Sequence, residues 1–201
     1  IITHEHSDHV KGAGILSRRF KLPVYITQKT YQACRGLGKM EDICFFECGT
    51  PFEIDQILIR PFSISHDAKD PVGLTMEYKN HKIGIATDLG IATNLVKEHL
   101  KNSNILYLES NHDPEMLING PYPWHLKQRI KGRTGHLSNL DAGSLISELK
   151  TDNLKHVILA HLSEENNCPQ KAVQEILKNL NGSNVTLHVA GPDEVGKFIK
   201  L

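Results

Sequence analysis

The sequence predicts a layered α/β fold, and two patterns carry this prediction. First, short apolar runs typical of buried strands alternate with amphipathic runs that have the period of helices. Because these elements bury their apolar sides against one another, their alternation favours sheets covered by helices. Second, polar residues suited to chemistry follow apolar runs closely, namely His4, His66, Asp88, His112 and His161. Sites assemble where strands end on one edge of a layered fold, so these residues are candidates for one site.

The beginning of the chain predicts a strand, a turn and a helix. Ile1 and Ile2 are expected to end a buried strand, and Ser7 or Asp8 is expected to cap the next helix with its side-chain oxygen. That helix is predicted at residues 10–20. Its inward-facing side chains are expected to be Val10, Ile15 and Leu16, and its outward-facing ones Lys11, Arg18 and Arg19.

The rest of the chain continues the alternation. Strands are expected at residues 23–27, 44–48, 52–65, 73–78, 82–87, 105–108, 156–160 and 185–189, and helices at residues 28–34, 93–101, 124–130, 139–149 and 169–180. Residues 114–134 are expected to be less regular, because Pro121 and Pro123 interrupt helical hydrogen bonding. No internal repeat or linker divides the sequence, so we expect one domain over residues 1–201.

The composition is typical of a soluble globular protein. Of the 201 residues, 39% are apolar and 23% are charged, and no run is apolar enough to cross a membrane. The four cysteines form no C-x-x-C pair, which favours a reduced, cytoplasmic protein. Lys plus Arg and Asp plus Glu both number 23, so a nucleic-acid partner would need a local basic patch. The best candidates for phosphate contact are Lys127, Arg129, Lys131 and Arg133, although a solvated helix face would have the same composition.

A histidine-rich cluster near the start is typical of a metal site. His4, His6, Asp8 and His9 form the pattern H-x-H-x-D-H. Alternate residues of an extended chain point the same way, so His4 and His6 can share one ion. The following turn would direct Asp8 and His9 toward a second position. Imidazole suits zinc, and imidazole together with carboxylate suits zinc, manganese or iron.

Several stretches of the sequence together resemble the metallo-β-lactamase-fold hydrolases, in particular their YycJ/WalJ-like branch. They are THEHSDHVKG, SISHDAKDPVG, IATDLG, LESNHD, GHLSNLDAG and LAHLSEEN, and the resemblance extends from residue 1 to about residue 192. It implies a four-layer αββα sandwich with a dinuclear metal site at the sheet edges. It also implies strands ahead of the first motif, so we expect this chain to lack an N-terminal part and to expose an apolar flank.

The resemblance also implies a set of metal ligands. They are His4, His6 and His66 for one ion, Asp8, His9 and His161 for the other, and Asp88 between the two. The expected ions are two divalent metals, zinc or manganese, with iron as an alternative. From the residues alone, His66 could instead be a capping or core histidine, Asp88 a turn residue and His161 a buried histidine at a strand end.

Three residues are predicted to act in catalysis. Asp8 is one of them, in addition to its role as a ligand. His136 is similar to a histidine that assists phosphate cleavage in related ribonucleases, so it is expected to stabilise the transition state or protonate the leaving oxygen. Helix capping is the structural alternative for His136. His112, with Asp113, is expected to orient a ligand, and core packing is its alternative.

The resemblance favours a phosphodiesterase that acts on DNA as an exonuclease, with metal-activated hydroxide attacking phosphorus. An RNA-processing nuclease, or a hydrolase of thioesters, lactones or small cyclic phosphodiesters, is an alternative because the same metal centre supports these reactions. A binding module without catalysis is a further alternative, which the complete ligand set disfavours. No membrane partner is expected, and the sequence carries no signal for an oligomeric state.

Overall fold

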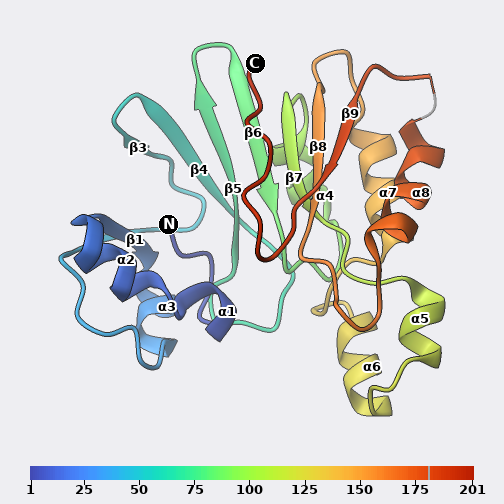
Figure 1. The fold of residues 1–201 in the computed structure, drawn as a ribbon. Helices are drawn as coiled ribbons and strands as arrows, with labels where there is room; N and C mark the ends of the chain where they lie inside the picture. Colours follow the sequence, from blue (N-terminus) through green and yellow to red (C-terminus); the bar gives the residue numbers. More distant parts are fainter. Residues whose placement is uncertain (181) are drawn as a thin grey trace.

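Two β-sheets pack face to face in the computed structural model, which describes residues 1–180 and 182–201 (Figure 1). The smaller sheet pairs β1 (Pro23–Thr27) with β2 (Asp42–Phe46) in parallel. The larger sheet has seven strands in sequence order: β3 (Phe52–Ile54), β4 (Ile57–Ser63), β5 (Val72–Tyr78), β6 (His81–Ala86), β7 (Ile105–Glu109), β8 (His156–Ala160) and β9 (Thr186–Val189).

Strand direction changes within the larger sheet. Strands β3 to β6 are antiparallel neighbours, and the hairpin between β5 and β6 pairs Tyr78 with His81. Strands β6 to β9 are parallel neighbours. Parallel strands end at the same edge of a sheet, so the loops after β6, β7 and β8 lie next to one another, where ligand sites form in such sheets.

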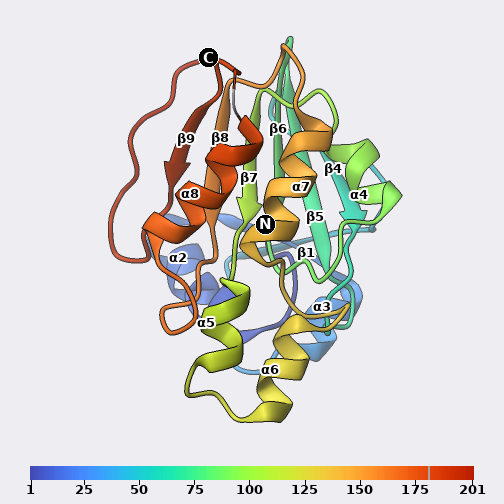
Figure 2. The same cartoon turned by 90° about the vertical axis from the view of Figure 1, so that its right-hand side faces the viewer.

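Helices cover the outer faces of both sheets. The smaller sheet carries α1 (Ser7–Val10), α2 (Ala13–Phe20) and α3 (Gln28–Ala33). The larger sheet carries α4 (Asn94–Leu100), α7 (Asn139–Leu149) and α8 (Pro169–Leu180), which lie in front of it in Figure 2. The two remaining helices, α5 (Pro114–Asn119) and α6 (Trp124–Lys131), lie beyond the edge at which the parallel strands end (Figure 1).

Buried apolar side chains hold these layers together. Leu108 of β7 packs with Ile146 of α7 and Ile176 of α8 in the core between the larger sheet and its helices. Between the sheets, the Tyr25 and Phe52 rings stack with their centroids 5.5 Å apart. The order helix, sheet, sheet, helix confirms the predicted αββα sandwich. None of the helices within the described ranges is long and apolar enough to cross a bilayer.

The predicted helix at residues 10–20 is wrong in its start and in two of its three inward-facing residues, whereas Val10 is buried as predicted. The helix is divided into α1 and α2, and α2 packs through Gly14 and Ser17, while Ile15 and Leu16 are 60% and 52% exposed. Small residues face inward because the backbone near Leu37 approaches closely; a methyl group on Gly14 would clash with the Leu37 carbonyl. Neither predicted cap forms, because His6 precedes α1 and makes no side-chain capping bond.

Three other predictions need correction. Ile1 and Ile2 are not in a strand, although the Ile2 N–H donates to the Tyr25 carbonyl over 2.8 Å. The strand expected at residues 52–65 is broken between β3 and β4 by a turn in which Asp55 has a φ of 52°. Helix α5 was not predicted. Asp113 caps it by accepting from the Met116 N–H over 2.9 Å, and Pro114 lies in its first turn, where no hydrogen bond is lost.

Candidate metal centre

The strand ends and the N-terminal turn bring the predicted ligands together. The chain leaves β6 toward Asp88 and leaves β8 directly at His161. His66 follows β4, and α1 carries Asp8 and His9. The histidine-rich turn leads into α1, which packs with the smaller sheet. Because the two sheets pack face to face, this turn lies at the edge of the larger sheet.

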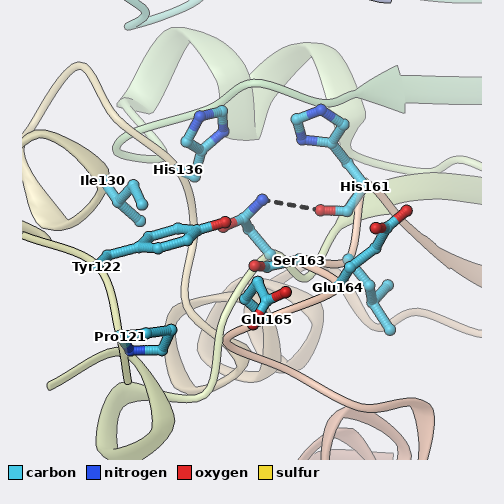
Figure 3. A pocket seen from close by; sticks show the side chains of 10 residues that line it. Pro121, Tyr122, Ile130, His136, His161, Ser163, Glu164 and Glu165 are labelled. Atoms are coloured by element: carbon cyan, nitrogen blue, oxygen red, sulfur yellow. Dashed lines mark hydrogen bonds between the residues drawn. The ribbon is translucent and has the colours of Figure 1, made fainter. Parts of the chain in front are cut away.

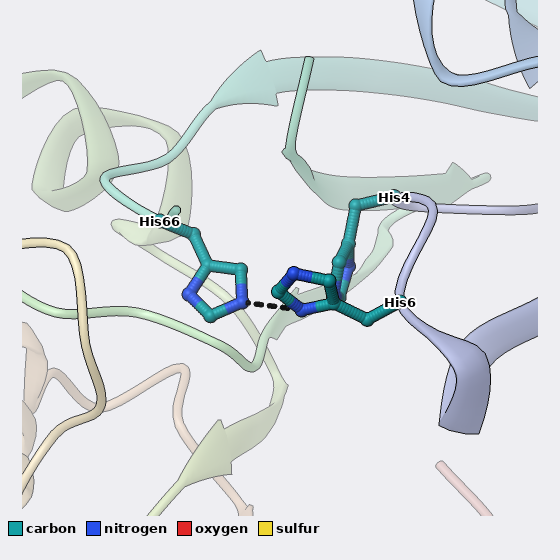
Figure 4. Close-up of side chains that lie close together, drawn as sticks. All are labelled: His4, His6 and His66. Carbon is teal, nitrogen blue, oxygen red and sulfur yellow. Dashed lines mark hydrogen bonds between the residues drawn. The ribbon is translucent and has the colours of Figure 1, made fainter. Parts of the chain in front are cut away.

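The first cluster consists of His4, His6 and His66 (Figure 4). The His66 Nε2 atom lies 3.2 Å from the His6 Nδ1 atom, and the three rings lie 4.7–4.9 Å apart. The other ring nitrogens of two members have polar neighbours. The His4 Nδ1 atom is 3.2 Å from the Thr3 hydroxyl, and the His66 Nδ1 atom is 3.2 Å from the Gly135 carbonyl. An Nδ1–H bonded to that carbonyl leaves the His66 Nε2 lone pair directed at the cluster.

The second cluster consists of Asp8, His9, Asp88 and His161. The His9 Nε2 atom lies 3.2 Å from Asp8 Oδ2 and 3.3 Å from Asp88 Oδ2. The His161 Nε2 atom lies 3.5 Å from Asp8 Oδ2 and 3.5 Å from Asp88 Oδ1. These four side chains therefore present nitrogen and oxygen atoms to one small volume.

Asp88 lies between the two clusters. Its Oδ1 atom is 3.8 Å from the His66 Nε2 atom of the first cluster, and the same carboxylate faces His9 and His161 of the second. Asp88 and His161 both have left-handed backbones, with φ values of 58° and 55°. Residues other than glycine seldom adopt this conformation, and it concentrates at functional sites where the surrounding structure holds it.

The buried atoms of this arrangement suit metal ions. His4 Nε2 is buried and makes no hydrogen bond within the described residues, whereas the buried His9 Nε2 atom faces the carboxylates of Asp8 and Asp88. Buried polar atoms are normally hydrogen-bonded, so the unpaired His4 Nε2 atom beside the rings of His6 and His66 indicates a missing partner. Imidazole and carboxylate groups in these proportions fit zinc, manganese or iron.

The charges of the ion-free centre are strongly coupled. Burial would lower the pKa of His9, but the carboxylates of Asp8 and Asp88 raise it to about 9. Burial opposes protonation of His161 in the same way, yet Asp8 and Glu109 raise its pKa to about 10. Burial, together with the charge of His9, lowers the pKa of His4 to about 3. The carboxylates thus hold protons at positions that divalent ions would otherwise occupy.

Glu109 belongs to this centre and was missed by the sequence analysis. It is fully buried at the end of β7, and its Oε1 atom accepts from His136 Nδ1 over 2.8 Å and from His161 Nδ1 over 2.7 Å. Its Oε2 atom accepts from the N–H groups of Leu89 and Leu137. Burial would raise the pKa of Glu109, but His136 and His161 hold it below its usual range. The available signal was an isolated glutamate at the end of an otherwise apolar strand.

His136 lies beside the second cluster, as the sequence analysis requires of a catalytic group. Its Nδ1 atom is fixed by Glu109 and lies 3.9 Å from Asp88 Oδ1. The ring also lines a cavity of about 710 Å³ that opens beside His161 (Figure 3). The capping alternative is not what the structure shows, because Ser138 caps α7 by accepting from the Asp141 N–H.

His112 is not placed among the metal-binding clusters of the described residues. Its side chain is buried, its Nδ1 atom has no hydrogen-bond partner, and its carbonyl accepts from the Asn139 N–H. The Asp113 carboxylate caps α5 and pairs with Lys171 at 3.1 Å. Glu109, rather than Asp113, is the carboxylate that the structure places against the proposed ligand His161.

In the basic stretch of Lys127, Arg129, Lys131 and Arg133, two of the four side chains already bind partners within the protein. Lys127 Nζ donates to the carbonyls of Ile118 and Gly120, and Arg129 Nε pairs with Asp67 at 2.6 Å. Lys131 and Arg133 are exposed and line a separate hollow of about 280 Å³ beside Gly90. The four residues thus differ in how far they are available to a phosphate backbone.

The fold and the donor set identify a class of protein. A family model described as "Beta-lactamase superfamily domain" matches residues 1–162, and the chain belongs to this superfamily. The structure of the metallo-β-lactamase fold protein YhfI from Bacillus subtilis matches 94% of this chain and 72% of its own, with a TM-score of 0.70 and 18% identity, which shows the shared fold.

Two curated relatives place the chain in the YycJ/WalJ-like branch. Exodeoxyribonuclease YycJ of Bacillus anthracis is 40% identical over 175 residues, which are 86% of this chain and 66% of the relative. Exodeoxyribonuclease WalJ of Streptococcus pneumoniae (strain D39) is 35% identical over 185 residues, which are 90% of this chain and 69% of the relative. The chain thus spans about two thirds of the length of these relatives.

Proposed function

We propose that the protein is a dinuclear metal-dependent phosphodiesterase that removes nucleotides from the ends of DNA. The observation that carries this proposal is the position of Asp88 between two clusters of ligands, with His136 held beside it by Glu109. The names of the YycJ and WalJ relatives, both exodeoxyribonucleases, support DNA as the substrate.

The proposed ligands are those implied by the resemblance. His4, His6 and His66 would hold one ion, Asp8, His9 and His161 the other, and Asp88 would contact both. Paired divalent ions about 3.5–4 Å apart supply an activated water nucleophile and stabilise charge on phosphoryl oxygens. In this assignment Asp8 is a ligand that also fixes the imidazoles of His9 and His161, from which its Oδ2 atom lies 3.2 and 3.5 Å.

The proposed proton donor is His136. Its Nδ1–H is engaged by Glu109, so its Nε2 atom is the one that can carry a proton to the leaving oxygen. Glu109 is a positioning residue in this scheme, because it also fixes His161 through the same oxygen atom. A fully buried carboxylate can hold both rings in one orientation throughout the reaction.

The test is a comparison of substrates under identical conditions. Protein loaded with manganese or with zinc is given linear duplex DNA, single-stranded DNA, RNA and a simple thioester. The proposal expects release of mononucleotides from DNA, and loss of that activity in Asp88→Ala together with loss of bound metal. Faster cleavage of RNA, or hydrolysis of the thioester alone, would replace DNA with one of the alternative substrates.

A further inference from the structure

The cavity beside His136 and His161 has two chemically different walls, which Figure 3 shows on opposite sides. Its volume of about 710 Å³ is large enough for a nucleotide. One wall is apolar and aromatic, and the facing wall is polar and acidic. The first consists of Pro121, Tyr122 and Ile130, and the second of Ser163, Glu164 and Glu165.

The charge of this lining decides which part of a nucleic acid fits. Glu164 and Glu165 are exposed carboxylates, and the residues that line the cavity include neither lysine nor arginine. A phosphate group placed against Glu164 and Glu165 would meet like charge. A sugar hydroxyl, by contrast, can donate a hydrogen bond to a carboxylate, and a nucleobase can stack on the ring of Tyr122.

We propose that this cavity binds the terminal nucleoside of a DNA strand whose end carries a free hydroxyl group. The inference rests on the proposed function, because it places the scissile phosphate at the metal centre and the terminal nucleoside next to His136 and His161. Tyr122 supports the base, and Glu164 and Glu165 receive the terminal hydroxyl. A second phosphate on the same sugar is excluded, so neither a phosphorylated end nor a continuing strand fits, and one nucleotide is removed at a time.

Binding of mononucleotides tests, without any turnover, whether the cavity excludes a second phosphate on the sugar. Calorimetry on the metal-loaded protein compares 5′-dAMP and 3′-dAMP with deoxyadenosine 3′,5′-bisphosphate. The bisphosphate should bind about tenfold more weakly than the better monophosphate, because two carboxylates oppose its second phosphate. The double variant Glu164→Gln/Glu165→Gln should reduce this ratio to about twofold or less. The matched control, Glu98→Gln/Glu115→Gln, removes two exposed carboxylates outside the cavity and should leave the ratio in place.

The aromatic wall has its own pair of variants. Tyr122→Ala should weaken binding of the monophosphate roughly 5- to 100-fold, the range for loss of one stacked base, whereas Tyr122→Phe should weaken it little. A deficit shared by both variants would assign the effect to the hydroxyl group instead, and equal binding by all three proteins would remove Tyr122 from the subsite.

The outcomes separate the subsite from the proposed function. Absence of nucleotide binding, equal affinity for the monophosphate and bisphosphate, or a ratio that the double glutamine variant does not change would overturn the subsite, even if DNA is degraded. Selective monophosphate binding by a protein that degrades no DNA would retain the subsite and reject the exonuclease. If the subsite and the exonuclease activity are both correct, DNA ends with a hydroxyl group should be degraded faster than otherwise identical phosphorylated ends.

Discussion

Glu109 shows how much one buried carboxylate can fix. Four donors converge on it, two ring N–H groups on Oε1 and two backbone N–H groups on Oε2. A glutamine would turn its NH₂ group toward one of these pairs of donors. We expect Glu109→Gln to destabilise the fold by about 1–3 kcal/mol per unpaired donor and to weaken metal binding roughly 10- to 100-fold. Denaturant unfolding and metal titration measure the two effects.

The control for this prediction is Glu115→Gln, which changes the same group at an exposed position on α5. If Glu109→Gln retained wild-type stability and metal affinity, the convergence of four donors would not be what holds His136 and His161 in place.

His136 should be separable from the metal ligands. In His136→Ala the metal content should remain, because neither proposed ligand cluster depends on that ring, while turnover should fall by roughly 10²–10⁴, the usual scale for a positioned proton donor. Elemental analysis and single-turnover cleavage give the two quantities. Loss of metal together with activity would make His136 a ligand, and unchanged turnover would make it structural.

The raised pKa values of His9 and His161 predict release of protons on metal binding. Both values, about 9 and about 10, exceed the ordinary 6.5, so at pH 7 both rings are protonated in the ion-free protein. Ions must displace these protons, so apparent affinity should rise as the pH is raised from 7 toward 9, with release of about two protons at pH 7. Calorimetry in buffers of different ionisation enthalpy counts them. A binding enthalpy independent of the buffer would contradict this.

At the scale of elements, glycine allows two loops to meet at the site. The Gly90 N–H donates to the Ser65 carbonyl over 2.8 Å, and a methyl group on Gly90 would clash with the Arg133 carbonyl. The loop that would have to move leads into Gly135, whose carbonyl faces His66, and into His136.

We therefore expect Gly90→Ala to destabilise the protein by about 1–3 kcal/mol, the usual result of overpacking, and to slow turnover. Thermal unfolding and steady-state rates test it. Gly12→Ala is the matched control, because a methyl group on Gly12 meets nothing within 4 Å and its φ is −90°. Equal effects of the two substitutions would mean that the loss of glycine itself, rather than the clash, is responsible.

Elements with a clear apolar pattern were predictable, and elements shaped by distant contacts were not. Strand β8 and helices α7 and α8 have the predicted bounds, because their apolar positions face the core between the larger sheet and its helices. Helix α2 has the opposite character. Its buried face is set by the close approach of the chain near Leu37, a contact that no local pattern in residues 13–20 contains.

At the scale of the whole molecule, the residues of the candidate metal centre also divide into those that a local motif predicts and those that only distant contacts reveal. The H-x-H-x-D-H motif is local, so His4, His6, Asp8 and His9 were visible as a group, and the structure brings them next to His66, Asp88 and His161. Glu109 was not visible, because its importance comes from partners 27 and 52 residues away in the chain. The engagement of Arg129 by Asp67 was hidden for the same reason.

The overall charge balance makes any contact with a nucleic-acid backbone a local matter. Lys127 and Arg129 already bind partners within the protein, so Lys131 and Arg133 are the better test of the predicted basic stretch. Lys131→Gln/Arg133→Gln should weaken DNA binding across sequences and flatten the dependence of log affinity on log salt by about 0.9 per lost contact. Binding is measured over a salt series with cleavage blocked. Lys197→Gln/Lys200→Gln is the control at the far end of the chain, and an unchanged slope would reject the stretch as a phosphate contact.

The composition of the two ligand clusters has a mechanical consequence. Each cluster joins side chains of the N-terminal turn to side chains that follow strands of the larger sheet. An ion held by either cluster would therefore join chain segments far apart in sequence, and because these segments meet only in the folded chain, it would stabilise the fold by binding to it alone. Occupancy by metal and closure of the sandwich would then be a single cooperative event. Ions would thereby join the N-terminal turn to the edge of the larger sheet.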